Sequence, residues 1–112
     1  MFDRNCVFCK IANGVLKADI IYKSDHSVVF SALSPVATFH KLVIPKKHII
    51  SLGKFGTNTD SFKVWDDMLV SINKVVQIFR LKRFKLVSNN SNNLQRIAHL
   101  HFHLISGKSV SE

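Results

Sequence analysis

The chain has 112 residues, 46% of them hydrophobic, and a formal net charge of +9. This length suits one domain, residues 1–112, and the apolar content is too high for a disordered chain. No apolar run in the sequence is long enough to cross a bilayer, and the first residues do not resemble a secretory signal, so we expect a cytoplasmic protein without a membrane partner. The charge favours polyanionic partners such as nucleotides, while nucleic acid lacks the support of an aromatic-plus-basic RNA-binding motif.

Short elements fill the first half of the chain. A helical turn is expected over residues 6–12, closed by Asn13-Gly14. Alternating or β-branched runs predict three strands, over residues 20–22, 27–30 and 41–44. The third strand is expected to end before Pro45, because proline cannot donate to a central ladder.

The clearest periodicity follows residues 58–61, which offer several N-cap side chains. Apolar residues then recur at steps of three and four along one stripe: Phe62, Trp65, Leu69, Ile72, Val76 and Phe79. A second stripe beside it holds Val64, Met68, Val75 and Ile78. The pattern predicts one long amphipathic helix. Its apolar face is wider than one contact needs, so we expect it to pack on a sheet and also on a second subunit.

Two further strands are expected after the helix, over residues 84–88 and 98–105, with a polar loop over residues 89–93 between them. The order of strands, long helix and strands predicts an α+β fold. We expect a mostly antiparallel sheet with the helix on one face.

Three histidines alternate in the last predicted strand, at His99, His101 and His103. Alternate side chains of a strand share a face, so the three rings should point one way while Leu100 and Phe102 enter the core. Two functions suit this pattern. The rings could bind a metal ion. Alternatively, one ring could attack phosphorus while its neighbour donates a proton or hydrogen bond, since the pKa of imidazole lies near neutrality.

The cysteines, Cys6 and Cys9, form a C-x-x-C pair near the N-terminus with no strand before it. A redox pair would follow a strand, and a structural disulfide is not expected in a reducing cytosol, so half of a zinc site is the better interpretation. His48 follows the strand that ends near Pro45. Together with one of the three alternating histidines, it would complete a Cys2His2 tetrahedron and leave two histidines for chemistry.

Three linked motifs resemble the histidine triad (HIT) superfamily: Cys6-Val-Phe-Cys9-Lys-Ile11, Leu42-Val-Ile-Pro-Lys-Lys-His48 and His99-Leu-His-Phe-His103-Leu-Ile. The resemblance runs from Cys6 to Gly107. It implies a HIT-like α+β fold, with a five-stranded antiparallel sheet, one long helix and a short N-terminal helix, and a homodimer that pairs strands and helices. The activity implied is hydrolysis at the α-phosphate of nucleoside 5′-monophosphate derivatives, of phosphoramidate or dinucleotide type.

The resemblance also assigns roles to individual residues. His101 corresponds to the nucleophile that forms a nucleotidyl-histidine, and His103 to a residue that holds the phosphate. The structural zinc set would be Cys6, Cys9, His48 and His99. A purine nucleotide would contact Phe8, Ile11, Phe30 and Leu33 at its base, and Asn89 and Gln95 near its phosphate. Apart from the resemblance, the positive charge of Arg96 makes it a further candidate to bind the phosphate.

Departures from the family pattern concern the pocket. Ala32 stands where the family usually has an aspartate that binds the ribose hydroxyls, and Leu94 replaces a glycine. Arg96 stands where nucleoside phosphoramidate hydrolases carry a small hydroxyl residue. These changes bear on substrate choice more than on fold. They motivate two alternatives to the hydrolase: a catalytically weak nucleotide- or partner-binding module, and, from the net charge, a protein that processes nucleic-acid 5′ ends.

Overall fold

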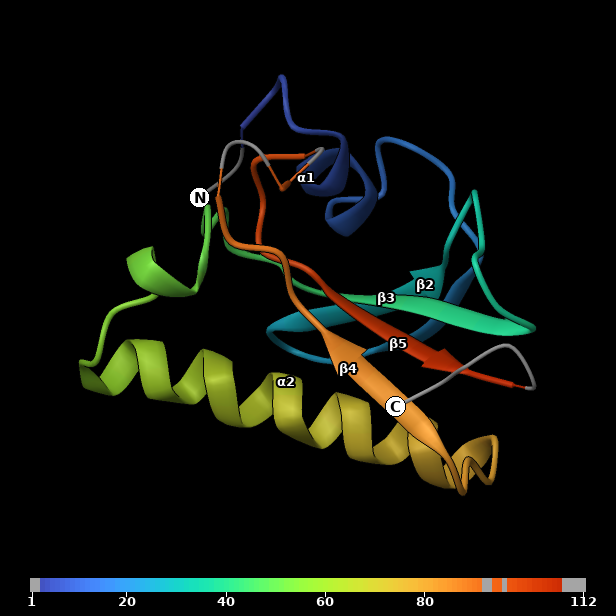
Figure 1. Ribbon diagram of the computed structural model, residues 1–112. Helices are drawn as coiled ribbons and strands as arrows, with labels where there is room; N and C mark the ends of the chain where they lie inside the picture. Colours follow the sequence, from blue (N-terminus) through green and yellow to red (C-terminus); the bar gives the residue numbers. More distant parts are fainter. Residues whose placement is uncertain (1–2, 92–93, 96, 108–112) are drawn as a thin grey trace.

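Five strands form one antiparallel sheet in the order β1-β2-β3-β5-β4 in the computed structural model, which describes residues 3–91, 94–95 and 97–107 (Figure 1). The strands are β1 (Ile20–Lys23), β2 (Ser27–Ser31), β3 (Phe39–Pro45), β4 (Phe84–Val87) and β5 (Phe102–Ser106). The helices are α1 (Val7–Ala12), α2 (Thr59–Ile78) and the short 3-10 helix η1 (Leu52–Lys54). The predicted α+β fold, with a long and a short helix, is confirmed.

The helices begin where their capping residues allow. Asn58 accepts a hydrogen bond from the Ser61 N–H at 2.9 Å and so satisfies one free donor in the first turn of α2. The Cys6 Sγ accepts from the Cys9 N–H at 3.3 Å and caps α1 in the same way. The C-x-x-C pair is therefore part of the helix start, and both sulfurs are held on one side of α1.

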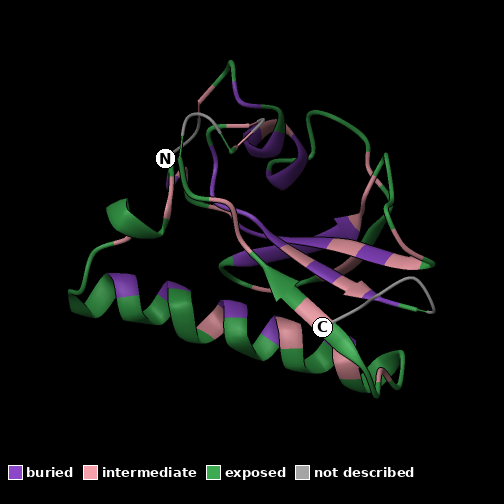
Figure 2. Ribbon diagram, viewed as in Figure 1, coloured by how far each residue is buried: buried purple, intermediate pink, exposed green. Residues whose placement is uncertain are grey.

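The sheet separates two hydrophobic cores, with α1 on one face and α2 on the other (Figures 1 and 2). Alternation along β2 directs Phe30 toward the α1 side and Val29 toward the α2 side. β3 divides in the same way, with Leu42 on the α1 side and Val43 on the α2 side. No helix among the described residues is long and apolar enough to span a membrane.

Three residues of the second predicted α2 stripe, Val64, Met68 and Val75, belong to the buried seam of the helix. The buried seam of α2 consists of Ser61, Val64, Met68, Ser71 and Val75. The more regular apolar stripe lies on the flank, where Phe62 is 51% exposed and Leu69 is 58% exposed. Ser61 and Ser71 complete the buried seam, at positions that a hydrophobic pattern alone does not mark. The hydroxyl of Ser71, for example, lies 2.6 Å from that of Ser27 on β2.

Pro45 is the last residue of β3, not the residue after it, and β3 begins at Phe39, two residues before the predicted start. The Lys46 N–H donates to the His26 carbonyl at 2.8 Å, so the nitrogen of the preceding Pro45 faces the opposite side, toward β5. β5 begins with Phe102 opposite Val43. Pro45 has no N–H to donate, but β5 does not extend opposite it, so no hydrogen bond between β3 and β5 is lost.

The last strand is also shorter than predicted: β5 begins at Phe102, not at residue 98. The backbone before it leaves the ladder, because the Leu100 N–H donates to the Ile49 carbonyl at 2.6 Å. The alternation nevertheless holds. Leu100, Phe102 and Leu104 belong to the core on the α2 side, and the three histidines lie on the α1 side, where the rings of His99 and His101 are both near Phe8.

Candidate active site and metal centre

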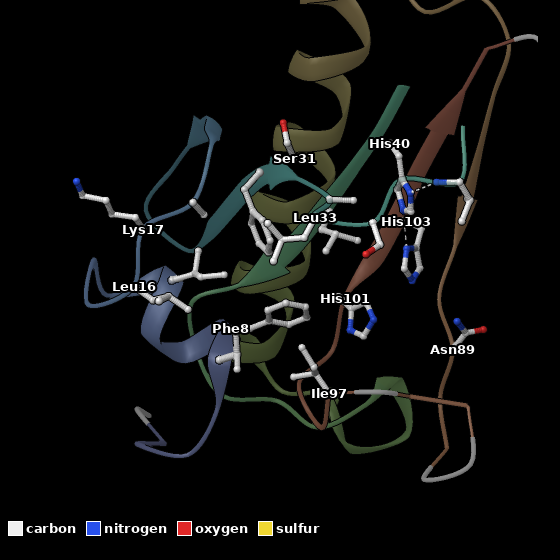
Figure 3. A pocket seen from close by; sticks show the side chains of 18 of the residues that line it. Phe8, Leu16, Lys17, Ser31, Leu33, His40, Asn89, Ile97, His101 and His103 are labelled. Atoms are coloured by element: carbon white, nitrogen blue, oxygen red, sulfur yellow. Dashed lines mark hydrogen bonds between the residues drawn. The ribbon is translucent and has the colours of Figure 1, made fainter. Parts of the chain in front are cut away.

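His101 and His103 line a cavity of about 490 Å³ on the α1 side of the sheet (Figure 3). The four side chains expected to contact the base also line it, namely Phe8, Ile11, Phe30 and Leu33, as does Asn89. The rings of Phe8 and His101 meet edge to face with 5.0 Å between their centroids. An aromatic wall and two histidines therefore face one space.

The structure does not place every predicted pocket residue in this cavity. Gln95 is not among the lining residues, and its side-chain amide donates to the Ile50 carbonyl at 2.8 Å. Arg96 lies outside the described residues. Leu94 and Ala32, two of the departures from the family pattern, do line the cavity.

A backbone carbonyl fixes the orientation of the His101 ring. The His101 Nδ1 lies 2.8 Å from the His99 carbonyl oxygen, which can only accept a hydrogen bond. Nδ1 therefore carries the proton in the neutral ring, and Nε2 keeps a free lone pair. Figure 3 shows this ring among the side chains that line the cavity. A neutral imidazole with its lone pair directed into a pocket can act as a nucleophile.

A fourth histidine, His40 on β3, fixes His103. The Val36 N–H donates to the His40 Nδ1 at 3.1 Å, so the neutral His40 ring carries its proton on Nε2. That Nε2–H donates to the His103 Nδ1 at 2.8 Å (Figure 3). His103 therefore carries its own proton on Nε2 and offers a donor. The sequence analysis missed His40, which no spacing rule links to His103.

Burial keeps these two rings neutral. Loss of hydration, together with the neighbouring His101 and His40, lowers the pKa of His103 to about 4. Burial and then the nearby Lys41 also lower the pKa of His40. The neutral Nε2–H of His103 is therefore a hydrogen-bond donor at neutral pH, and the ring does not carry the extra proton of a general acid.

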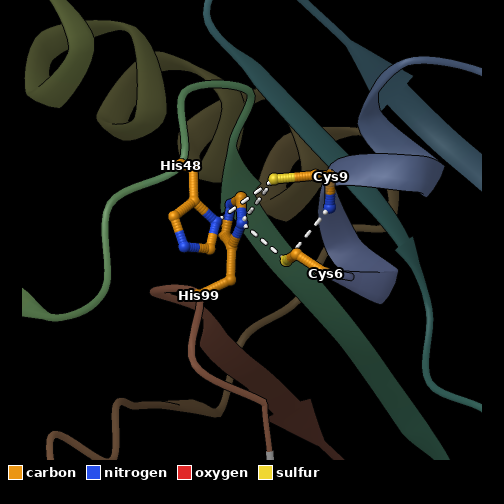
Figure 4. Close-up of side chains that lie close together, drawn as sticks. All are labelled: Cys6, Cys9, His48 and His99. Carbon is orange, nitrogen blue, oxygen red and sulfur yellow. Dashed lines mark hydrogen bonds between the residues drawn. The ribbon is translucent and has the colours of Figure 1, made fainter. Parts of the chain in front are cut away.

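The four predicted metal ligands, Cys6, Cys9, His48 and His99, come together at the start of α1 (Figure 4). Their ligand atoms all lie within 4.8 Å of one another. The Cys9 Sγ is 3.2 Å from the His48 Nδ1, and the Cys6 Sγ is 3.3 Å from the His99 Nδ1. Two thiols and two imidazoles form the Cys2His2 set that suits tetrahedral zinc.

In both imidazoles of this cluster, the ring nitrogen that faces away from the sulfurs has a polar neighbour. The His99 Nε2 donates to the Pro45 carbonyl at 2.8 Å, which leaves Nδ1 unprotonated and directed at the sulfurs. The His48 Nε2 lies 3.7 Å from the Asp3 carboxylate. Burial lowers the pKa of His99 to about 4 and raises the pKa of the Cys6 thiol. A bound cation would offset the cost of two buried thiolates, so the residues fit a metal ion.

Comparison with known proteins agrees with this geometry. Residues 5–112 match the family model described as "Scavenger mRNA decapping enzyme C-term binding". An uncharacterized HIT-like protein of Buchnera aphidicola is 31% identical over 109 residues, which cover 95% of this chain and 96% of that protein. An uncharacterized HIT-like protein of Methanocaldococcus jannaschii is 32% identical over 104 residues, with 89% and 77% covered.

Solved structures show the same relationship. A histidine triad protein from Clostridium difficile has a TM-score of 0.89 and 34% identity, with 100% of this chain and 98% of that chain covered. A HIT family hydrolase from Legionella pneumophila has a TM-score of 0.85 and 32% identity, with 96% of each chain covered. The architecture and the triad thus define a histidine triad fold. The chain belongs to the HIT superfamily.

The neutral state of His103 predicts a pH-dependent stability. Its pKa is lowered from 6.5 to about 4 in the folded protein, so the unfolded chain binds a proton more readily. The contribution to stability is therefore complete above pH 6.5 and is lost as the pH falls through about 4. The free energy of unfolding, measured by urea denaturation across this range, should fall less steeply in His103→Gln than in the wild type. Equal slopes would contradict this origin.

Proposed function

We propose that the protein is a nucleotide hydrolase that attacks the α-phosphate of nucleoside 5′-monophosphate derivatives through His101. The observation that carries the proposal is that the neighbouring rings of His101 and His103 differ at Nε2: one has a free lone pair and the other a proton. The His99 carbonyl leaves the His101 Nε2 with a lone pair, and His40 leaves the His103 Nε2 with a proton. One ring can thus attack phosphorus while its neighbour donates to a phosphate oxygen.

The reaction has two steps. The His101 Nε2 lone pair forms a bond to phosphorus, and the bond from phosphorus to the leaving group breaks with its electron pair on that group; an amine leaving group takes a proton from solvent. Water then attacks the nucleotidyl-histidine and loses a proton to solvent, the phosphorus–nitrogen bond breaks with its electron pair on Nε2, and nucleoside monophosphate is released. The His103 Nε2–H donates to a non-bridging oxygen, where negative charge grows in each transition state. Phosphoramidates and phosphoanhydrides both meet these requirements.

Features of the cavity support a purine nucleotide as the substrate. The Phe8 and Phe30 rings meet edge to face at 5.5 Å, and Ile11 is buried beside them. A flat aromatic base can pack on such a wall, as in most small-molecule sites. A histidine triad nucleotide-binding protein from Candida albicans has a similar solved structure, with a TM-score of 0.75 and 26% identity. The match covers 89% of this chain and 73% of that chain.

We assign zinc to the Cys2His2 cluster as a structural ion. Cys6, Cys9, His48 and His99 would fill all four positions of a tetrahedron, so no position would remain for water or substrate. Bound zinc would supply a cross-link between the N-terminal segment and the triad. A set with two thiolate ligands requires reduced cysteines, which favours the cytoplasm as the location.

We also assign a homodimer to the exposed flank of α2 and the outer edge of the sheet. Phe62 and Leu69 leave α2 partly uncovered, and Phe84 and Leu86 are each 43% exposed on β4, the edge strand. Unpaired edges and contiguous apolar side chains are typical of association surfaces. A second copy would cover both features.

Loss of the metal should unfold the N-terminal segment. Purified protein should hold about one zinc per chain, and Cys9→Ser should lose the metal and lower the melting temperature, because metal binding is coupled to folding. Metal analysis and thermal denaturation, before and after chelation and zinc restoration, measure both effects. Full zinc occupancy in a Cys6→Ser, Cys9→Ser double variant, or a Cys6–Cys9 disulfide in reduced protein, would overturn the assignment.

The nucleophile can be removed while its hydrogen bond is kept. Asparagine at position 101 can still donate to the His99 carbonyl but has no Nε2 lone pair. His101→Asn should therefore abolish hydrolysis of adenosine 5′-phosphoramidate while AMP affinity changes little. Wild-type protein quenched during turnover should carry an acid-labile nucleotidyl group on His101.

Further measurements distinguish a hydrolase from a binding module. His103→Ala should weaken both phosphate binding and turnover, because its Nε2–H serves both. Full activity in His101→Asn would disprove the mechanism. Wild-type protein that binds AMP but turns over no phosphoramidate would instead be a binding module.

The dimer can be tested with adjacent residues of similar exposure. Leu69 is 58% exposed and lies on the apolar flank, whereas Val70 is 50% exposed and lies about 100° further round the helix. Leu69→Glu should shift the mass measured by light scattering from dimer toward monomer, since it places a charge in the interface. Val70→Glu should leave the dimer intact. A monomeric wild type, or identical masses for both variants, would refute this interface.

A further inference from the structure

The pocket face of the sheet has a defined order of side chains. The register pairs Phe30 on β2 with Leu42 on β3, and Leu42 with His103 on β5. These three residues form one row across the sheet. Ala32 directly follows the end of β2, two residues beyond Phe30, and its N–H donates to the His40 carbonyl at 3.1 Å. The neighbouring row therefore begins Ala32–His40.

This order locates the sugar, given the function proposed above. The base packs near Phe30 and the phosphorus lies at the histidines, two strands away, a span of roughly 10 Å at the usual spacing of strands. The sugar that joins them must cross β3 at Leu42, with Ala32 and His40 beside it. An isopropyl and a methyl group thus face the sugar.

The polar groups near this crossing are already engaged. Both nitrogens of His40 are used, one by the Val36 N–H and one by His103. The Ser31 hydroxyl donates to Asp19 at 2.7 Å and accepts from Lys41 at 3.0 Å. The described residues that line the cavity include no carboxylate.

Lys17 and Asn89 lie away from the crossing: Lys17 is exposed, and Figure 3 shows it pointing outward and Asn89 on the far side of His101. Ser34, a further hydroxyl of the lining, is exposed to solvent. A hydroxyl at C2′ would therefore gain no charged partner from the described walls beside Leu42.

We propose that the sugar subsite does not select for ribose, and that 2′-deoxy- and 2′-O-methyl-nucleotides are substrates of the same site. Without a carboxylate at position 32, the 2′-hydroxyl gains no charge-assisted hydrogen bond, which elsewhere contributes about 1.5–3 kcal/mol. The small Ala32 side chain leaves room for a methyl group at the same place. Ala32 is thus the specificity-determining residue, because it allows sugars with and without a 2′-hydroxyl to bind.

The test compares three adenylates in two assays. The kcat/KM values for the 5′-phosphoramidates of adenosine, 2′-deoxyadenosine and 2′-O-methyladenosine should agree within about threefold, since the described lining offers no charged contact that distinguishes them. Calorimetry with the three corresponding monophosphates should give similarly close affinities. A preference for ribose greater than about tenfold in either assay would overturn the inference while leaving the hydrolase intact.

Two variants at one position provide matched controls. Ala32→Asp adds an acceptor and should introduce a preference for ribose of at least about tenfold. Ala32→Leu adds bulk without an acceptor and should discriminate against the 2′-O-methyl compound alone. An Ala32→Asp variant as indifferent to the sugar as the wild type would show that the sugar lies elsewhere. If the wild type neither binds nor hydrolyses any of the adenylates, the proposed function fails and the inference with it.

Discussion

The hydrogen bonds of His99 join the two halves of the site. Its side chain is fully buried, with Nε2 bonded to the Pro45 carbonyl and Nδ1 directed at the cysteine sulfurs. Its main-chain carbonyl holds the Nδ1–H of His101. One residue thus contributes a candidate metal ligand with its ring and orients the proposed nucleophile with its backbone. A shift of His99 would change both, so the proposed metal centre and the proposed attack are physically coupled.

The sheet sets the spacing of everything else. Antiparallel pairing places His40 and His103 on neighbouring strands of one face, although they are 63 residues apart in the chain. The Val36 N–H donates to His40, and His40 in turn donates to the His103 Nδ1. The proton of the neutral His103 ring is therefore fixed on Nε2. The chain of hydrogen bonds needs no charged residue, which suits a buried site because a neutral network avoids the desolvation cost of ions.

The sequence predicts most strongly what depends on local geometry. Strand alternation alone places the three histidines opposite Leu100 and Phe102, and this holds even where the ladder has not yet begun. Motif resemblance groups four side chains that are distant in the sequence, and the structure places them together. What depends on register between strands could not be read, and His40 is the clearest case. Ser61 and Ser71 of the buried α2 seam were not predicted, because hydrophobic periodicity does not mark polar residues.

The net charge of the molecule differs from the charge of the cavity lining. The chain carries a net charge of +9, while the described cavity lining has neutral His40 and His103 and no carboxylate. The long-range field therefore attracts an anion, and the cavity itself adds no acidic group to repel it. An acidic residue at position 32 would increase discrimination between sugars, but it would also place a negative charge beside the path of a phosphate. Given the proposed function, alanine there gives up selectivity for the sugar and keeps the field around the α-phosphate favourable.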